Sequence, residues 1–145
     1  MGQRSCITRD KDKKKIKALS NFDIMQKLQD KKNFIGINPE EVLQPRQSAI
    51  FNLDEFDGSH WTACRHQGSK IEYFDSYGLK PSHNIQFYLL KSNVPIFYNT
   101  TQLQPTDSES CGYFAIKFIK SKKNFSDFLD QFVQKPSELN DDIIR

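Results

Sequence analysis

The stretch HWTACRHQGSKIEYFD, residues 60–75, decides the predicted fold. Residues 61–66 and 71–74 have the composition of short strands, and Gln67-Gly68-Ser69-Lys70 between them has that of a tight turn. We therefore predict an antiparallel hairpin. In such a hairpin His60 and Asp75 lie at the same end, with the carboxylate within reach of the imidazole ring.

The segments that flank the hairpin predict more strands and helices. Residues 48–53 and 95–101 suit strands, and residues 85–90 suit a helix. From Cys111 onward apolar residues fall at helical spacing, which predicts a helix that begins at this cysteine. The order of elements predicts an α+β fold: a mostly antiparallel central sheet packed by helices, with Cys111 at a helix N-terminus.

Three weaker helix signals lie outside this block. Apolar residues recur every three positions over residues 19–28, behind a Ser20 cap and with Asp23 in the first turn. Asn38-Pro39-Glu40-Glu41 has the pattern of another helix start, and Ser126 is the expected cap of a final helix through Val133. The periodic apolar residues of the first helix are Leu19, Phe22, Met25 and Leu28.

Length and charge predict one domain and a basic arm. The chain has 145 residues, of which 37% are hydrophobic and 27% charged, and we expect one globular domain over residues 19–145. Residues 1–18 are polar and lysine-rich and are expected to form a flexible arm. Lysines cluster there and again over residues 117–123, where weak DNA binding is one explanation and a solvated surface the commoner one.

The three cysteines predict free thiols. Cys6, Cys64 and Cys111 are an odd number at wide spacing, and no secretory signal precedes them, so we expect an intracellular protein without disulfides. No apolar run approaches the roughly 20 residues that span a bilayer. The sequence thus predicts a soluble monomer in the nucleus or cytoplasm.

Cys111 has the context of a reactive thiol. It follows a polar loop and precedes Gly112, so its sulfur would lie at the positive end of a helix, which favours the thiolate. Gly112 would let a substrate backbone approach closely. Gln104, seven residues earlier (111 minus 104), could donate its side-chain amide to an oxyanion beside the backbone N–H of Cys111, and Gln102 is its nearest rival.

His60 is the candidate base for this thiol. It stands at the mouth of a strand, and Asp75 would orient its ring. Asp57 and Asn84 are weaker substitutes for Asp75, and Trp61 is expected to pack against the histidine and restrict it. Each residue alone has an ordinary structural explanation, but their combination predicts a catalytic site.

A metal site is the weaker alternative. Cys64 and His66 share a strand face and lie near His60, but no second pair at ligand spacing completes a zinc site.

These residues resemble the adenovirus protease group of cysteine proteases. The resemblance covers residues 19 to 132 and follows the order His, acid, Gln, Cys-Gly. SUMO-specific Ulp-type proteases share this pattern, commonly with a Gln-to-Cys gap one residue shorter. The motif sequences are especially similar to those of proteases from Maverick/Polinton transposons and large DNA viruses. The motifs are Gly58-Ser59-His60-Trp61, Tyr73-Phe74-Asp75-Ser76-Tyr77-Gly78, Gln104 and Ser110-Cys111-Gly112.

The resemblance implies a papain-like mechanism on a compact α+β fold, without a metal. Cys111 would attack a peptide carbonyl, His60 would shuttle protons and Gln104 would help hold the oxyanion. Substrates would be viral or transposon structural precursors cut after small residues, and packaging of the enzyme in virions is a further expectation. Stimulation by DNA or by an activating peptide would also follow, although this chain is shorter than the adenoviral enzymes and has no cysteine near Asn93.

Two other functions stay open on sequence. A protease that removes ubiquitin-like modifiers would share the catalytic residues but act on a ubiquitin-like conjugate. A catalytically silent module that binds nucleic acid or protein would use the lysine clusters instead.

Overall fold

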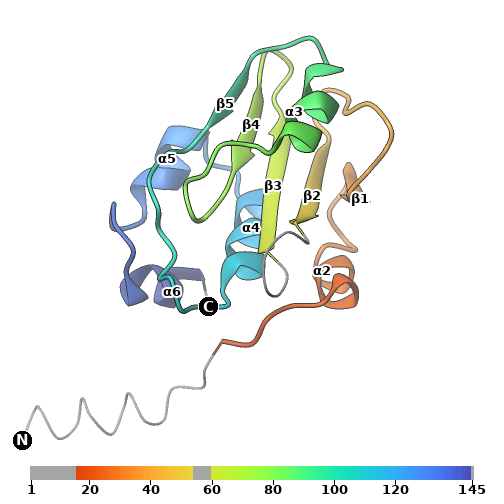
Figure 1. Cartoon of the computed structure of the whole chain (residues 1–145). Coiled ribbons are helices and arrows are strands. Elements are labelled where there is room, and N and C mark those ends of the chain that lie inside the picture. Colours follow the sequence, from red (N-terminus) through yellow and green to blue (C-terminus); the bar gives the residue numbers. More distant parts are fainter. Residues whose placement is uncertain (1–15, 54–59, 145) are drawn as a thin grey trace, which may run out of the picture.

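A five-stranded sheet forms the centre of the protein (Figure 1). The computed structural model describes residues 16–53 and 60–144. Chain order is also spatial order: the three central strands are antiparallel, and each edge strand runs parallel to its neighbour. The α+β class and the antiparallel centre of the sheet are thus confirmed. The strands are β1 (Phe34–Ile37), β2 (Ser48–Leu53), β3 (His60–His66), β4 (Ile71–Phe74) and β5 (Ile96–Tyr98).

The predicted hairpin is β3 and β4. Their register pairs Ala63 with Phe74 and His66 with Ile71, and the turn closes with a 2.8 Å hydrogen bond from the Gln67 N–H to the Lys70 carbonyl. Every residue of β3 is buried, because helices cover both faces of the sheet. Successive side chains of β3 therefore enter different layers of the core.

Figure 1 shows the sheet between α3 and α4. On the α4 side, phenylalanines stack on Phe74 of the sheet; on the α3 side, Phe51 and Tyr73 pack with Tyr88 and Leu89. Among the helices described, none is both long and apolar enough to cross a bilayer. The helices are α2 (Asn21–Lys27), α3 (His83–Leu90), α4 (Cys111–Lys120), α5 (Phe125–Asp130) and α6 (Glu138–Ile144).

The first predicted helix is present, but its expected apolar face is wrong. Ser20 caps α2, and its hydroxyl and the Asp23 carboxylate form the predicted capping box. Phe22 and Met25 are nevertheless 72% and 46% exposed, whereas Ile24 is fully buried. A strict three-residue spacing drifts by about 60° per step around a helix of 3.6 residues per turn, so it does not stay on one face.

Two other predictions from the sequence are wrong. No helix starts at residues 38–41, because Asn38 adopts φ 48° and its side-chain oxygen accepts the N–H of Asn52, which ends β1 in a turn. The cap of α5 is Asn124 rather than Ser126, and the helix ends at Asp130. Strand β1 and helix α6 were not predicted.

The predicted arm ends at residue 18, close to residue 16, where the described part of the chain begins. Residues 1–15, which include every lysine of the first cluster except Lys17, lie outside the described residues. Leu19 is buried in the core beside α4.

Candidate active site

His60 and Asp75 meet at one end of the central hairpin, as predicted. His60 begins β3 and Asp75 directly follows β4, and His60 Nε2 lies 2.8 Å from Asp75 Oδ1. The same carboxylate oxygen accepts the N–H of Tyr77 at 2.8 Å. Asn99 binds the backbone on both sides, because its Oδ1 accepts the Asp75 N–H at 3.0 Å and its Nδ2 donates to the Asp75 carbonyl at 2.6 Å. These contacts therefore fix the position of Asp75 independently of its contact with the histidine.

Cys111 is the first residue of α4, and its side chain hydrogen bonds with that of His60. Burial lowers the pKa of His60, but the hydrogen bonds with Asp75 and Cys111, together with their negative charges, outweigh it and raise the pKa to about 9. At neutral pH this favours an imidazolium beside the sulfur, the partner that a thiolate needs.

The ring against His60 is that of Tyr77, not of Trp61. The Tyr77 ring stacks on the imidazole with centroids 4.7 Å apart and planes 25° apart. Trp61 follows His60 in β3 and therefore points to the α4 face, where it is buried and donates its Nε1–H to the Leu19 carbonyl at 3.1 Å. The predicted packing of Trp61 on the histidine is wrong for this reason.

Gln104 is fully buried and its amide is held in a fixed orientation. Its Oε1 accepts from the Ser76 hydroxyl at 2.5 Å, and its Nε2 donates to the Ser108 carbonyl at 2.7 Å and to the Tyr77 hydroxyl at 3.4 Å. Gln102, the rival, donates its Nε2 to the Gln104 carbonyl at 2.9 Å and so supports the backbone of Gln104. Of the two amides, that of Gln104 contacts the ring that stacks on His60.

Glycines at two places of the motifs allow close packing within the protein. A Cβ on Gly112 would lie 3.0 Å from the Leu19 side chain, so the absence of a side chain at Gly112 makes room for Leu19. Gly78 has φ 72°, and a Cβ there would lie 2.6 Å from the Thr101 backbone. Gly78 thus brings the Asp75 turn against the segment that leads to Gln104.

Of the weaker candidates from the sequence, those that the structure describes do not join this cluster. Asn84 lies on the exposed side of α3, and Asp57 lies outside the described residues. His66 accepts the Gly68 N–H on its Nδ1, and burial lowers its pKa. Burial also raises the pKa of Cys64 to about 12. Within residues 16–53 and 60–144, no group of three His, Cys, Asp or Glu side chains could hold a metal ion.

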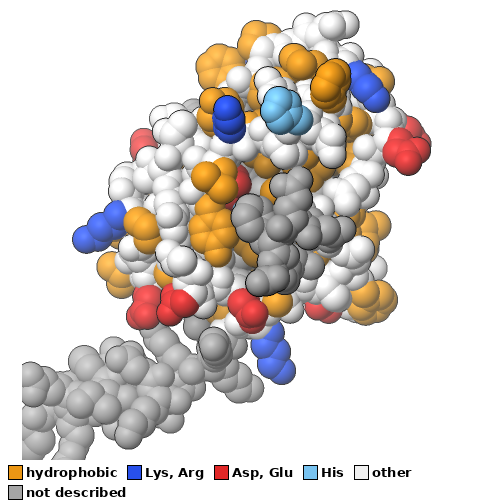
Figure 2. Space-filling view, in the orientation of Figure 1, with side chains coloured by type: hydrophobic (Ala, Val, Ile, Leu, Met, Phe, Trp, Pro, Cys, Tyr) orange, Lys and Arg blue, Asp and Glu red, His pale blue; other side chains and the backbone are white. Residues whose placement is uncertain are grey.

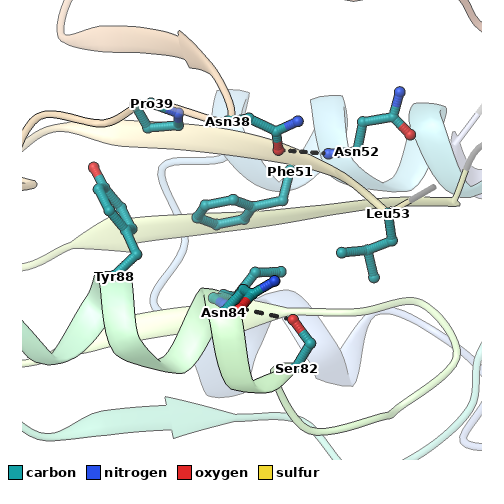
Figure 3. Close-up of a pocket in the computed structure, with 9 residues that line it drawn as sticks. Asn38, Pro39, Phe51, Asn52, Leu53, Ser82, Asn84 and Tyr88 are labelled. Atoms are coloured by element: carbon teal, nitrogen blue, oxygen red, sulfur yellow. Dashed lines mark hydrogen bonds between the residues drawn. The ribbon is translucent and has the colours of Figure 1, made fainter. Parts of the chain in front are cut away.

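A cavity of about 360 Å³ adjoins the histidine end of the sheet, between β2 and the start of α3. Figure 3 shows Phe51, Leu53 and Tyr88 around it, with Asn38 and Asn84 at its rim. Leu53 pairs directly with His60 across the β2–β3 ladder, so both side chains lie on the same face of the sheet. The cavity therefore offers room for a side chain of a bound segment close to His60.

Sequence reasoning missed the residues that hold the predicted ones. Ser76 and Tyr77 stand in the quoted motif, but nothing in it indicated that they bind Gln104. Asn99 and Asp141 carry no local signal, because they contact residues 24 and 31 positions away.

Comparisons with known proteins give distant structural similarity. No family model matches the chain, and no curated protein matches it. Two crystal structures of the ASFV pS273R protease are similar to it, one of them of the selenomethionine protein. Identity is 20% in both; the TM-scores are 0.47 and 0.46, over 61% and 70% of this chain. The chain spans only 39% and 43% of those proteins, so the case for its site rests on its own geometry.

Proposed function

We propose that the chain is a cysteine-type endopeptidase with Cys111 as nucleophile, His60 as general base and Asp75 as the residue that orients the histidine. The observation that carries the proposal is the buried chain of contacts from Cys111 to His60 to Asp75, at the first residue of a helix. A structural histidine needs no hydrogen bond to a thiol. A nucleophilic cysteine needs a base, and a base needs a group that orients it.

The arrangement supports a two-step hydrolysis. The Cys111 thiolate attacks the carbonyl carbon of a peptide bond, and the His60 imidazolium gives its proton to the departing amine as the C–N bond breaks. Water then attacks the thioester, His60 takes its proton, and the carboxylic acid and the thiol are released. Asp75 holds the imidazole through Nε2 and so fixes the orientation of the ring during both steps.

Gln104 is the proposed side-chain donor to the oxyanion, together with the backbone N–H of Cys111. Its Nε2 carries two protons: one is bound by the Ser108 carbonyl at 2.7 Å, and the other meets only the long 3.4 Å contact with Tyr77. The second proton is thus the one that a developing negative charge would take. Preorganised donors of this kind contribute about 10²–10³-fold to the rate.

For the substrate, we propose structural precursor proteins of a virus or a Maverick/Polinton-type transposon, on the strength of the motif resemblance. A side chain of such a substrate would enter the cavity beside Leu53. A role for DNA stays a proposal of lower rank. On the face seen in Figure 2, the described Lys and Arg side chains stand apart rather than gather in a patch.

The test compares two buried cysteines. Purified protein is assayed for cleavage of fluorescein-labelled casein and for release of p-nitrophenolate from p-nitrophenyl acetate. We expect Cys111→Ala to lose both activities, and Cys64→Ala, which removes the other buried thiol, to keep them in the folded protein. Equal activity of wild type and Cys111→Ala would refute the proposal. Covalent capture by a ubiquitin-like vinyl sulfone without casein cleavage would favour the deconjugating protease instead.

A further inference from the structure

The start of α4 differs from the starts of the other capped helices. Ser20, Ser82 and Asn124 have extended backbones with ψ between 165° and 170°, and each side chain accepts an N–H of the first turn of its helix. Ser110, at the cap position of α4, has ψ 0° and makes no such bond. Its side chain is therefore held by something else.

The partner of Ser110 is Asp141, a buried carboxylate of α6. The Ser110 hydroxyl donates to Asp141 Oδ1 at 2.7 Å. The Ser108 hydroxyl lies 2.8 Å from Asp141 Oδ2 and 2.7 Å from the Ser110 hydroxyl, and its single proton can serve one of these acceptors at a time. The Ser110 N–H donates to the Ser108 hydroxyl at 3.2 Å. One carboxylate thus holds both serines that precede the nucleophile.

The neighbouring residue of α6 holds the other end of the same loop. Asn140 is fully buried, and its Nδ2 donates to the Leu103 carbonyl at 3.0 Å and to the Val133 carbonyl at 2.9 Å. Its Oδ1 accepts the Val133 N–H at 2.7 Å. Figure 1 shows α6 beside α4, and the two helices are in contact. Residues 103–110 are therefore fixed at both ends by two adjacent side chains.

Between these anchors lie both proposed donors to the oxyanion. Gln104 follows Leu103, and its Nε2 donates to the carbonyl of Ser108, one of the two serines that Asp141 binds. The Cys111 N–H follows Ser110. A shift of residues 108–110 would move the Gln104 amide and the Cys111 backbone together.

We propose that Asp141 is a positioning residue of the active site: by accepting hydrogen bonds from Ser108 and Ser110 it aligns the loop that carries the two oxyanion donors. It acts through the serines and does not touch the substrate. It also turns the Ser110 hydroxyl away from the first-turn N–H groups of α4, so that the cap does not compete for them. The inference rests on the proposed peptidase function.

Two reactions of Cys111 separate positioning from folding. With p-nitrophenyl acetate, the thiolate adds to the ester carbonyl, the carbonyl oxygen becomes an oxyanion, the C–O bond breaks, and a thioester and p-nitrophenolate result. With iodoacetamide, the thiolate displaces iodide from a saturated carbon, and no oxyanion forms. Only the first reaction needs the aligned donors, whereas both need a folded protein with an ionised thiol.

The expected result for Asp141→Asn is about 10-fold slower acylation of Cys111, because donors out of place stabilise the oxyanion less. Alkylation, measured at a pH where the rate has reached its plateau, should change by less than about 2-fold. Glu138→Gln is the matched control, since it removes one carboxylate charge from an exposed position of the same helix and should leave both rates unchanged. Ser110→Ala and Ser108→Ala test the same contacts from the other side if Asp141→Asn does not fold.

Four outcomes decide the matter. Slower acylation with normal alkylation supports the inference. Equal loss of both reactions, or no loss of either, overturns it and leaves Asp141 a structural residue. If the wild type is alkylated but never acylated, the proposed peptidase function fails, and the role of Asp141 falls with it.

Discussion

At one end of the β3–α4 pair His60 and Asp75 lie beside Cys111, and at the other end Arg65 and Glu72 lie beside the last turn of α4. Both ends bury an ionisable side chain of β3 that makes a hydrogen bond to α4. They differ in what the buried groups are still able to do. The His60 end contains the proposed base and thiol, whereas the Arg65 end contains an ion pair held in a network of hydrogen bonds.

The Arg65 end is saturated with hydrogen bonds. The guanidinium donates from Nε and one terminal nitrogen to Glu72 Oε1, at 3.1 and 2.6 Å, and it lies 4.1 Å from the centre of the Phe118 ring. Its other N–H groups donate at 3.1 Å to carbonyls at the end of α4 and just after it, where the helix dipole favours a cation. All five donors of the arginine are used. These carbonyls belong to Phe118, Ser121 and Lys123.

On one scaffold, buried charge stabilises the structure at the Arg65 end and would serve the proposed chemistry at the His60 end. The saturated pair fixes the far end of α4 on the sheet. With that end fixed, the start of α4 presents Cys111 to His60. Predictions for the two ends therefore differ in kind: loss of activity at one, loss of stability at the other.

The largest expected effect is on activity at the His60 end. His60→Ala should lower the rate of p-nitrophenyl acetate turnover by about 10⁴-fold, because the thiol loses its base. His66→Ala is the matched control at the other end of β3, and its turnover in the folded protein should stay close to that of wild type. A similar loss in the two variants would show that His60 has no special place in the reaction.

The next largest effect is on stability at the Arg65 end. Glu72→Ala should lower the free energy of unfolding by about 3–5 kcal/mol, because it leaves the Arg65 charge buried without its partner. Urea unfolding followed by circular dichroism measures this. The double variant Arg65→Met with Glu72→Leu should lose less, since an apolar pair removes the unpaired charge. If the single and double variants were equally unstable, packing rather than charge would hold this end.

The smallest effect is on the pH dependence of stability, where the two histidines act with opposite sign. The pKa of His60 is raised from 6.5 to about 9, so protonated His60 stabilises the fold below pH 6.5, and this contribution is lost as the pH rises to about 9. The pKa of His66 is lowered by burial, so its contribution is lost as the pH falls through 6.5.

Unfolding free energies measured from pH 5 to pH 10 should show the contributions of His60 and His66 disappear in different variants. His60→Gln should flatten the alkaline limb, and His66→Gln the acid limb. If His60→Gln flattened the acid limb, or His66→Gln the alkaline limb, the two contributions would be assigned to the wrong histidines.

The sequence predicted the elements whose signals are local. The hairpin of residues 60–75 carries its strands and its turn in one stretch, and the helix from Cys111 shows its apolar period directly. The hairpin and this helix together bring the predicted residues His60, Asp75 and Cys111 close to one another. Strand β1 was missed because four residues in a parallel edge pair have no turn signal, and α6 because a seven-residue helix shows hardly two turns of pattern.

The supporting contacts were beyond the reach of sequence for a different reason. That Asn99 binds the backbone of Asp75, or that Asp141 binds Ser110, depends on how distant segments pack. Trp61 shows the reverse error: its place next to His60 in the chain suggested a contact that the alternation of a strand forbids.

The place of Trp61 has a consequence for observing the molecule. It is the only tryptophan in the sequence, it is buried, and its indole N–H is bound to the carbonyl of Leu19. Intrinsic fluorescence excited at the indole therefore comes from a single point, one residue from the proposed base and in contact with the segment before α2. Release of Leu19 from the core would wet this ring, so emission would move to longer wavelength while the rest of the protein stayed folded.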